Sequence, residues 1–268
     1  MPIDTQKVRS ALEVLGEDRY GFFLSGWFNN LSADLYISSR HSNRYAELYK
    51  HTTFIQDDLW NIQTIVFRLE WHKGLYAKNQ LSDGIWMAFA GCDINTFYIE
   101  MRSILDYAAK IIREISDKPG QVRNGSFEQL SNWTNNPKSH DKLGKELVSL
   151  IQYCSWFEEI KNIRDGLVHQ GNRPLVFIDK KEILFQVYKG LLQSIRIPEI
   201  MFNENVVNFE RYAGLYLAYL IDYLEKLSEI AYKKLNLKKS PVNARSYNLG
   251  VEIVRSWINN LLVSNKNL

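Results

Sequence analysis

Hydrophobic residues recur every three to four positions through most of this chain, which is the periodicity of an amphipathic α-helix. Short polar stretches rich in Gly, Pro, Asn and Ser separate the helical stretches and mark where each one ends. The pattern predicts helices at residues 45–73, 85–115, 127–133, 141–169 with a bend near Ser155, 205–235 and 244–262. The clearest predicted core stripes are Phe97, Met101, Ile104, Leu105, Ala108, Ile111 and Ile112, and later Phe209, Tyr212, Tyr216, Tyr219, Leu220, Tyr223, Leu224, Leu227 and Ile230.

One segment departs from the helical pattern. Residues 175–178 and 183–188 are rich in β-branched and aromatic side chains and flank a polar four-residue turn, 179–182. This arrangement predicts a β-hairpin, and because a two-stranded ribbon is marginal alone, the hairpin must pack on the helices.

The chain is therefore predicted to be mainly α, a helical bundle with a small β-hairpin insertion. Residues 1–44 are expected to form an N-terminal helical extension. Residues 45–235 form the main helical domain, with the hairpin at about 175–188, and residues 236–268 form a basic linker and a C-terminal helix.

Composition narrows the class of protein further. Hydrophobic residues make up 46% of the 268 residues, so disorder is excluded as the main state. The net charge of +3 permits RNA as a partner but does not argue for it, because dedicated nucleic-acid binders are usually far more basic. Aromatic content is high, yet the tyrosines at helical spacing are predicted to belong to the core, not to a base-stacking surface.

The cellular compartment is predicted from three features that the sequence lacks: a disulfide framework, a secretory signal and a long apolar run. The two cysteines, Cys92 and Cys154, lie in apolar helical stretches and are expected to be buried free thiols of a reducing compartment. The first residues show no apolar segment behind a basic one, so no secretory signal is predicted. No run of about 18 apolar residues occurs, so no contact with a membrane is expected and the protein is predicted to be cytoplasmic.

The sequence lacks the motifs of most common catalytic and cofactor-binding sites. Glycine-rich phosphate loops, zinc-ligand spacings and the nucleophile elbow of serine hydrolases are absent, so no cofactor and no metal are expected. Asp57 and Asp58 are adjacent, and neighbouring helical residues point about 100° apart. We therefore expect this pair on a solvated helix surface, not in an acid–base dyad.

Polar chemistry concentrates at the end of the predicted helix 141–169, in the stretch RDGLVH. Arg164 is a permanent cation whose planar donors suit a phosphate, and His169 can exchange a proton near neutral pH. Asp165 lies four residues before His169 and could fix the tautomer of its imidazole. On an ideal helix Arg164 and His169 are about 7.5 Å and about 140° apart, so both reach one cleft only if Arg164 stretches or the last turn unwinds near Gly166.

The residues alone also permit a purely structural interpretation, and they favour it. Arg164 would then pair with a nearby carboxylate, and His169 would cap the C-terminal end of the helix, where its charged form suits the helix dipole.

The stretch from Arg164 to His169 resembles the Rx4-6H motif of the HEPN superfamily (higher eukaryotes and prokaryotes nucleotide-binding domains), including the polar residue after the arginine. The segment TFYIEMRSILDYAAKII, residues 96–112, resembles the central helix that precedes the motif helix in that superfamily. The resemblance covers about residues 45–235, and the hairpin after HQGN is similar to that of some uncharacterised bacterial branches.

The resemblance implies an HEPN-like helical bundle that forms a homodimer through the motif helix. It implies a metal-independent endoribonuclease that leaves a 2′,3′-cyclic phosphate, with His169 as the acid–base group and Arg164 on the scissile phosphate. Asp165 would orient His169, and Asp106 on the central helix would support Arg164. Gly171 stands where some members carry a modified tyrosine, which disfavours that variant.

Three functions remain open from the sequence. The first is an endoribonuclease acting in bacterial defence or in a toxin–antitoxin pair, with RNA as substrate and an antitoxin or defence protein as partner. The second is a non-catalytic HEPN-like module that binds a nucleotide or a protein. The third is a plain helical scaffold whose motif is only a capped helix end.

Overall fold

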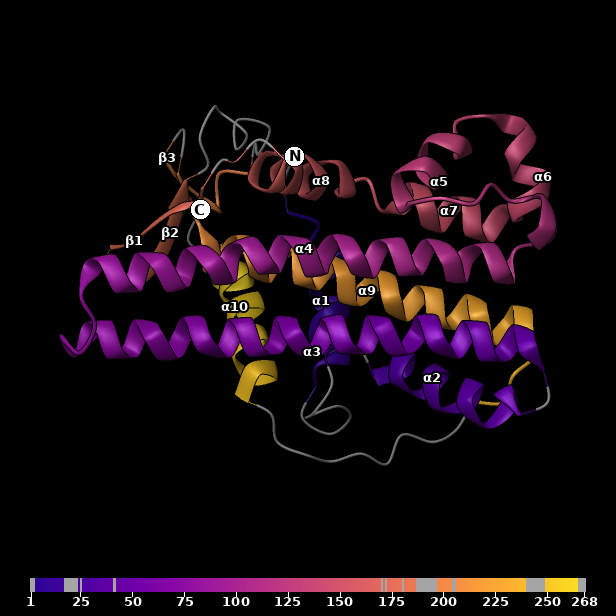
Figure 1. The fold of residues 1–268 in the computed structure, drawn as a ribbon, viewed down its shortest axis with the longest axis horizontal. Helices are drawn as coiled ribbons and strands as arrows, with labels where there is room; N and C mark the ends of the chain where they lie inside the picture. The colour runs from indigo at the N-terminus through magenta and orange to yellow at the C-terminus, as the bar shows by residue number, and fades with distance from the viewer. Residues whose placement is uncertain are drawn as a thin grey trace.

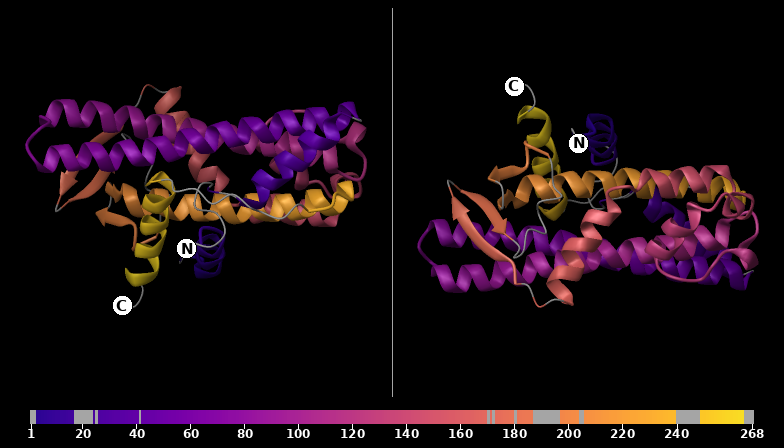
Figure 2. Two further views of the ribbon diagram at one scale, coloured as in Figure 1. Left: turned by 90° about the horizontal axis from the view of Figure 1, so that it is seen from below. Right: turned by 90° about the horizontal axis from the view of Figure 1, so that it is seen from above.

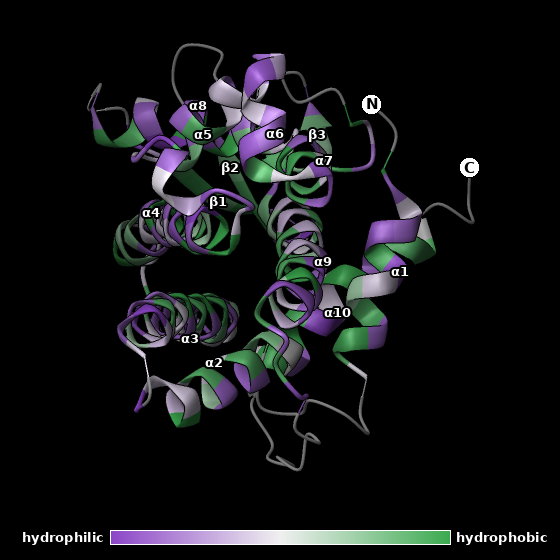
Figure 3. Ribbon diagram, turned by 90° about the vertical axis from the view of Figure 1, so that its right-hand side faces the viewer, coloured by the Kyte–Doolittle hydropathy of each residue, from purple (hydrophilic) through white to green (hydrophobic). Residues whose placement is uncertain are grey.

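Three long helices carry the fold, as seen in a computed structural model that describes residues 3–16, 24, 26–40, 42–169, 171, 173–179, 181–186, 197–203, 206–239 and 249–264. Helices α3 (Asn43–Ala77) and α4 (Asp83–Ile115) run antiparallel, joined by a short turn, and α9 (Phe209–Leu235) lies along them (Figure 1). Seen end on, these three helices surround a common interior (Figure 3).

The N- and C-terminal segments join the same hydrophobic core. Helix α1 (Thr5–Val14) packs against α9, α2 (Gly26–Ser39) against α3 and α9, and α10 (Leu249–Ser264) against α9 and α3. Figure 2 shows α10 and α1 beside α9, on the side away from α4. Val8, Leu31 and Trp257 from these helices are buried in one continuous cluster with residues of α3, α4 and α9.

The predicted helix 141–169 is three helices in the structure. They are α6 (His140–Leu143), α7 (Lys145–Tyr153) and α8 (Phe157–Val168), preceded by α5 (Phe127–Thr134) and two short 3-10 turns, Pro119–Gln121 and Pro137–Ser139. Gly144 takes a φ of +89° between α6 and α7, and a turn at residues 154–156 separates α7 from α8. The predicted bend near Ser155 is therefore a full break.

The predicted hairpin is confirmed, but it is only half of a four-stranded antiparallel sheet. The strands β1 (Leu175–Asp179), β2 (Glu182–Gln186), β3 (Met201–Asn203) and β4 (Val206–Asn208) are ordered β1-β2-β4-β3. Asp179 pairs with Glu182, so the turn is tighter than the predicted 179–182. Residues 187 and 188 of the predicted second strand lie outside the described residues.

The start of α9 corrects a second boundary. The helix begins at Phe209, after β4, and not near residue 205 as predicted. The side chain of Asn208 accepts a hydrogen bond from the backbone N–H of Arg211 at 3.0 Å, which is the N-cap geometry that starts a helix. β4 thus runs directly into α9 and ties the sheet to the bundle.

The predicted core stripes are confirmed almost residue for residue. All seven stripe residues of α4 are fully buried, and on α9 only Ile230 is partly exposed. The tyrosines of α9 pack on one another and on α4, with the rings of Tyr212 and Tyr216 4.5 Å apart. They are core residues, as expected, and present no stacking surface to solvent.

The cysteines are both free, but they differ in burial. Cys154 is buried as predicted, whereas Cys92 is exposed on α4. No helix within the described ranges is long and apolar enough to cross a membrane.

Candidate functional site

Helix α8 lies along α4 because its inner face is apolar. The buried residues of that face are Phe157, Ile160, Ile163, Gly166 and Leu167. The ring of Phe157 packs edge-on against Phe127 of α5 at 4.9 Å, and the guanidinium of Arg102 on α4 lies 4.7 Å from the Phe157 ring centre. Burial of the inner face leaves Arg164, Asp165 and His169 toward the outside.

A buried polar contact also joins α8 to α9. The hydroxyl of Tyr216 donates a hydrogen bond to the Glu159 carboxylate. Burial raises the pKa of Glu159 and the pKa of Tyr216 above their ordinary values. This contact fixes the rotation of α8 about its axis, and hence the direction in which Arg164 leaves the helix.

The C-terminal end of α8 is built as the sequence predicts. The backbone N–H of His169 donates to the Asp165 carbonyl at 3.0 Å, and Gly171 follows with a φ of +65°, a conformation that favours glycine. Pro174 then passes close to Gly91 of α4, so the chain returns to the bundle. The side chain of His169 is left 64% exposed.

The structure brings the three motif side chains together. Arg164 Nη1 lies 2.6 Å from His169 Nε2 and 2.9 Å from Asp165 Oδ1. Helix α8 continues unbroken to Val168, so Arg164 reaches His169 by extending along the helix, and the last turn does not unwind at Gly166.

This contact assigns the protonation of the imidazole. A guanidinium can only donate, so His169 Nε2 must accept and carry a lone pair, which places the ring proton on Nδ1. The Nε2 lone pair is therefore occupied by the Arg164 guanidinium in this structure.

Asp165 is placed differently from the sequence-based expectation. Its Oδ1 bonds Arg164, while His169 Nε2 lies 4.0 Å away, beyond hydrogen-bond distance. Asp165 therefore orients the guanidinium and not the imidazole. The reason is that the extended Arg164 side chain occupies the space between the two.

Asp106 does not support Arg164, contrary to prediction. One of its carboxylate oxygens accepts from Arg102 Nε at 3.3 Å, and the other accepts from the backbone N–H of Phe127 at 2.8 Å. Asp106 thus holds the first turn of α5 against α4, a role that depends on a helix far away in sequence.

The other cations near α8 are largely neutralised. Glu128 of α5 binds Lys161 Nζ at 2.7 Å and lies 3.6 Å from Arg102 Nη2. Arg173, four residues after His169, is exposed and has no ion pair with the described residues. Sequence reasoning missed Arg173, although its position directly after the motif in GNRP was a usable signal.

Arg164 keeps unused hydrogen-bonding capacity. Its Nε is buried and has no partner among the described residues. A buried donor without a partner costs free energy, and a phosphate oxygen could satisfy it only after the Arg164 side chain has moved.

Exposed apolar side chains lie on α8 and on the elements packed near it. Val168 directly precedes His169, and Ile99 lies on α4, which packs against both α8 and β1. β1 is an edge strand and exposes Leu175 and Phe177. Such residues near a polar site are typical of a surface that another protein covers.

Metal ligands do not gather in the part of the chain that the structure describes: no three His, Cys, Asp or Glu side chains form a possible metal site there. Comparison of the chain with protein-family models, with curated proteins and with solved structures finds no significant match.

Proposed function

We propose that this protein is a metal-independent endoribonuclease of HEPN type. The observation that carries the proposal is the contact of Arg164 Nη1 with His169 Nε2 at the exposed end of α8. It joins a cation suited to phosphate and a proton acceptor in one place, and both are exposed enough for a substrate to reach.

The two groups divide the chemistry of RNA cleavage between them. Once Arg164 Nη1 turns from His169 to the phosphate, the freed lone pair on His169 Nε2 takes the proton of a ribose 2′-hydroxyl as the 2′-oxygen attacks the adjacent phosphorus. The bond from phosphorus to the 5′-oxygen breaks, the leaving oxygen gains a proton, and a 2′,3′-cyclic phosphate remains. Arg164, oriented by Asp165, stabilises the negative charge that develops on the phosphate oxygens.

We propose a homodimer formed through the motif helix as the active species. One His169 can serve as base while the same residue of the second copy protonates the leaving oxygen. The exposed Val168, Leu175 and Phe177 support a protein contact beside the motif. RNA is the proposed substrate, and a defence protein or an antitoxin is the proposed partner.

A second candidate function, a non-catalytic HEPN-like module that binds a nucleotide or a protein, is favoured by one observation. Most cations around α8 are paired with carboxylates, so the site has little charge to spare for a long RNA backbone.

RNA cleavage in EDTA tests the first function. Wild type should convert single-stranded or transfer RNA to fragments with 2′,3′-cyclic phosphate ends, and His169→Ala and Arg164→Ala should lose this activity by at least about a hundredfold. His72→Ala, which removes an imidazole from α3, is the matched control and should cleave like wild type. Equal activity of His169→Ala and wild type, or no cleavage by wild type across broad RNA pools, would refute the proposal.

Expression in a host cell separates the two candidates. A nuclease should slow growth, and Arg164→Ala should restore it. Harmless expression of the wild type together with nucleotide or protein binding that depends on Arg164 favours the module.

A further inference from the structure

Strand β1 has one edge that no other described strand pairs with. The strand order β1-β2-β4-β3 places β2 on one side of β1 and leaves the other side open. Figure 1 shows the sheet at the end of the bundle where α3 turns into α4. Proteins usually protect such an edge with charges, bulges or a covering element, but residues 175–178 are all apolar. The open edge of β1 is therefore a candidate for pairing with another chain.

The hairpin register shows which main-chain groups point to the open edge. A two-residue turn follows Asp179, so the odd-numbered residues of β1 form the hydrogen-bonded pairs with β2. Ile183, which lies opposite Ile178, agrees with this alternation, because its N–H donates to Glu210 at 3.2 Å and not to β1. Val176 and Ile178 therefore direct their N–H and C=O groups away from β2, toward the open edge.

Four side chains along this segment share one face, because side chains alternate along an extended strand. They are Arg173, Leu175, Phe177 and Asp179. Arg173 precedes Pro174, and a residue before proline favours the extended backbone that this alternation requires. Leu175 is 50% exposed and Phe177 is 36% exposed. Arg173 and Asp179 make no ion pair with the described residues. The face thus carries a cation at one end, an anion at the other and apolar side chains between them.

We propose that β1 pairs antiparallel with β1 of a second copy of this chain, with Val176 on the two-fold axis. Rotation about this axis sets Leu175 against Phe177 of the second copy. The same rotation sets Arg173 against Asp179 of the second copy. Each pair occurs twice in the dimer, so the strand is complementary to itself in charge and in apolar contact. Val176 exchanges two main-chain hydrogen bonds with Val176 of the second copy.

Charge selects this register over its neighbour. If Phe177 stood on the axis, Arg173 would face Lys181 of the second copy, and Leu175 would face Asp179. Like charges directly opposite each other are destabilising across a strand pair, so that register is disfavoured. Opposite charges instead attract at both ends of the proposed pairing, which favours a second β1 as the occupant of this edge.

The strand pairing gives a mode of contact to the proposed homodimer. It rests on that part of the proposed function and not on RNA cleavage. β1 begins shortly after His169 in the chain, so both motifs would lie next to one interface. A pair of five-residue strands buries less than the roughly 1,200–2,000 Å² of a standard stable interface. We therefore expect a weak dimer whose population rises with protein concentration.

Sedimentation equilibrium over a range of protein concentrations tests the pairing through its charges, once circular dichroism shows that each variant folds. Wild type should dimerise reversibly. Arg173→Asp and Asp179→Arg each set like charges opposite each other twice in the dimer, so each should weaken dimerisation by at least about tenfold. The double variant restores opposite charges and should dimerise within about threefold of wild type. A residue that acted only on folding would not be rescued in this way.

Hydrogen exchange of the wild type gives a second readout that needs no substitution. The Val176 amide points to the open edge, so it should exchange at least about tenfold more slowly at concentrations where the dimer predominates than at high dilution. An exchange rate of this amide that does not change with protein concentration would overturn the proposal.

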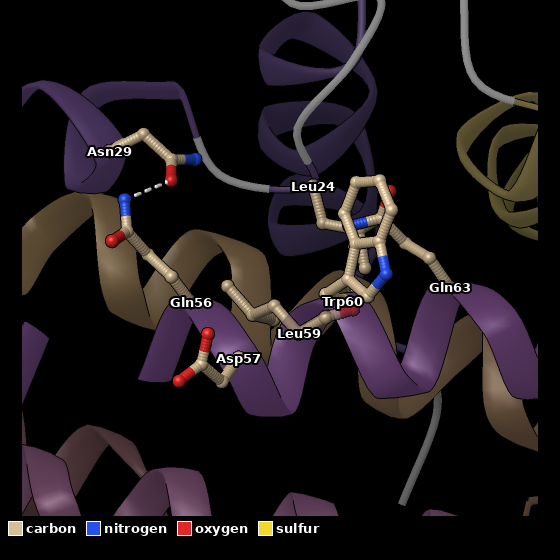
Figure 4. Close-up of a pocket in the computed structure, with 7 residues that line it drawn as sticks. All are labelled: Leu24, Asn29, Gln56, Asp57, Leu59, Trp60 and Gln63. Carbon is tan, nitrogen blue, oxygen red and sulfur yellow. Dashed lines mark hydrogen bonds between the residues drawn. The ribbon is translucent and has the colours of Figure 1, made fainter. Parts of the chain in front are cut away.

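Trp60→Ala is the matched control for loss of an exposed aromatic side chain. Trp60 lies on α3 beside Leu24 and Gln63 and is 47% exposed (Figure 4). This variant should dimerise like wild type, whereas Phe177→Ala should weaken dimerisation by at least about tenfold. Weakening in Trp60→Ala but not in Phe177→Ala would move the contact to α3 and overturn the proposal.

Three further results of sedimentation would overturn the proposal. The first is a wild type that stays monomeric up to about 1 mM, which would leave this edge to a strand of another protein. The second is a dimer that both single charge variants leave unchanged. The third is a folded double variant that does not regain dimerisation. A wild type that dimerises with this charge dependence but cleaves no RNA would refute the nuclease and support the strand pairing.

Discussion

Arg164 and His169 are five residues apart, yet the Nη1 atom of Arg164 lies 2.6 Å from Nε2 of His169. The same Nη1 lies 2.9 Å from Asp165 Oδ1. One nitrogen thus meets a carboxylate and an imidazole at once, while Nε of the same side chain remains without a partner among the described residues. The guanidinium is thus held by Asp165 and His169 through Nη1, while its Nε donor is enclosed by the protein.

Arg164→Lys is the sharpest test of this geometry. A lysine keeps the charge but has a single nitrogen, so it cannot hold Asp165 and His169 and also present a second donor. We expect cleavage to fall about tenfold to a hundredfold, measured as initial rates on a labelled RNA. Lys161→Arg on the same helix keeps the charge at a residue bound to Glu128 and should leave the rate unchanged. Wild-type activity in Arg164→Lys would show that charge alone is enough.

The environment of Asp58 predicts how folding stability depends on pH. The sequence placed it on a solvated surface, but it is half-buried beside Glu100 and Ser103 of α4. Burial, together with the nearby carboxylates of Glu100 and Asp57, raises the pKa of Asp58 to about 7, although a hydrogen bond from Ser103 opposes the shift. The folded protein therefore holds a proton that the unfolded chain releases near pH 4, so folding stability falls as the pH rises from about 4 to about 7.

Asp58→Asn should remove the loss of folding stability that the buried carboxylate causes above about pH 7. At pH 8 we expect the variant to be more stable than wild type by about 1–2 kcal/mol, after allowing for solvent screening, with no gain near pH 4. Thermal unfolding at the two pH values measures this. Glu47→Gln, an exposed carboxylate on the same helix, is the control and should give no pH-dependent gain. A gain of the same size at both pH values would contradict the explanation.

The helices were predictable because their periodic patterns are long. The stripe from Phe97 to Ile112 spans more than four turns, and every residue of it is buried. β3 and β4 were not predictable, because each has three residues and their pairing depends on β2, as in Leu184 opposite Asn208. No local pattern in Met201–Asn203 distinguishes a strand from a turn.

The contacts of the candidate site residues also differ in how far the sequence predicts them. The meeting of Arg164 and His169 follows from their spacing on one helix, which the sequence contains. The partner of Asp106 does not, because the N–H of Phe127 reaches it only after α5 has folded back onto α4. Even the local geometry was predictable only in part, because Asp165 binds Arg164 and not His169, and contacts between distant elements were not predictable.

Two tyrosines of α9 should respond oppositely to loss of the hydroxyl. The Tyr216 hydroxyl bonds the largely buried Glu159 carboxylate, which Tyr212 also contacts, so Tyr216→Phe removes one of its hydrogen bonds and should cost about 0.5–1.5 kcal/mol of the free energy of unfolding. The Tyr223 hydroxyl is buried without a partner among the described residues, so Tyr223→Phe should be neutral or stabilising. Urea unfolding of both variants measures the difference, and equal losses would contradict the assigned contacts.

Replacing two helical glycines with alanine should change the free energy of unfolding in opposite directions. A Cβ added at Gly214 of α9 would lie 3.0 Å from the backbone carbonyl carbon of Trp257 in α10, whereas one added at Gly74 of α3 meets nothing within 4 Å. Gly214→Ala should therefore push α10 off α9 and cost about 1–3 kcal/mol. Gly74→Ala should gain about 0.5–1 kcal/mol, because alanine loses less conformational freedom in a helix. Urea unfolding measures both changes, and fluorescence of Trp257, buried against Phe209, reports whether α10 has moved. A stabilised Gly214→Ala would mean that α10 does not pack this closely on α9.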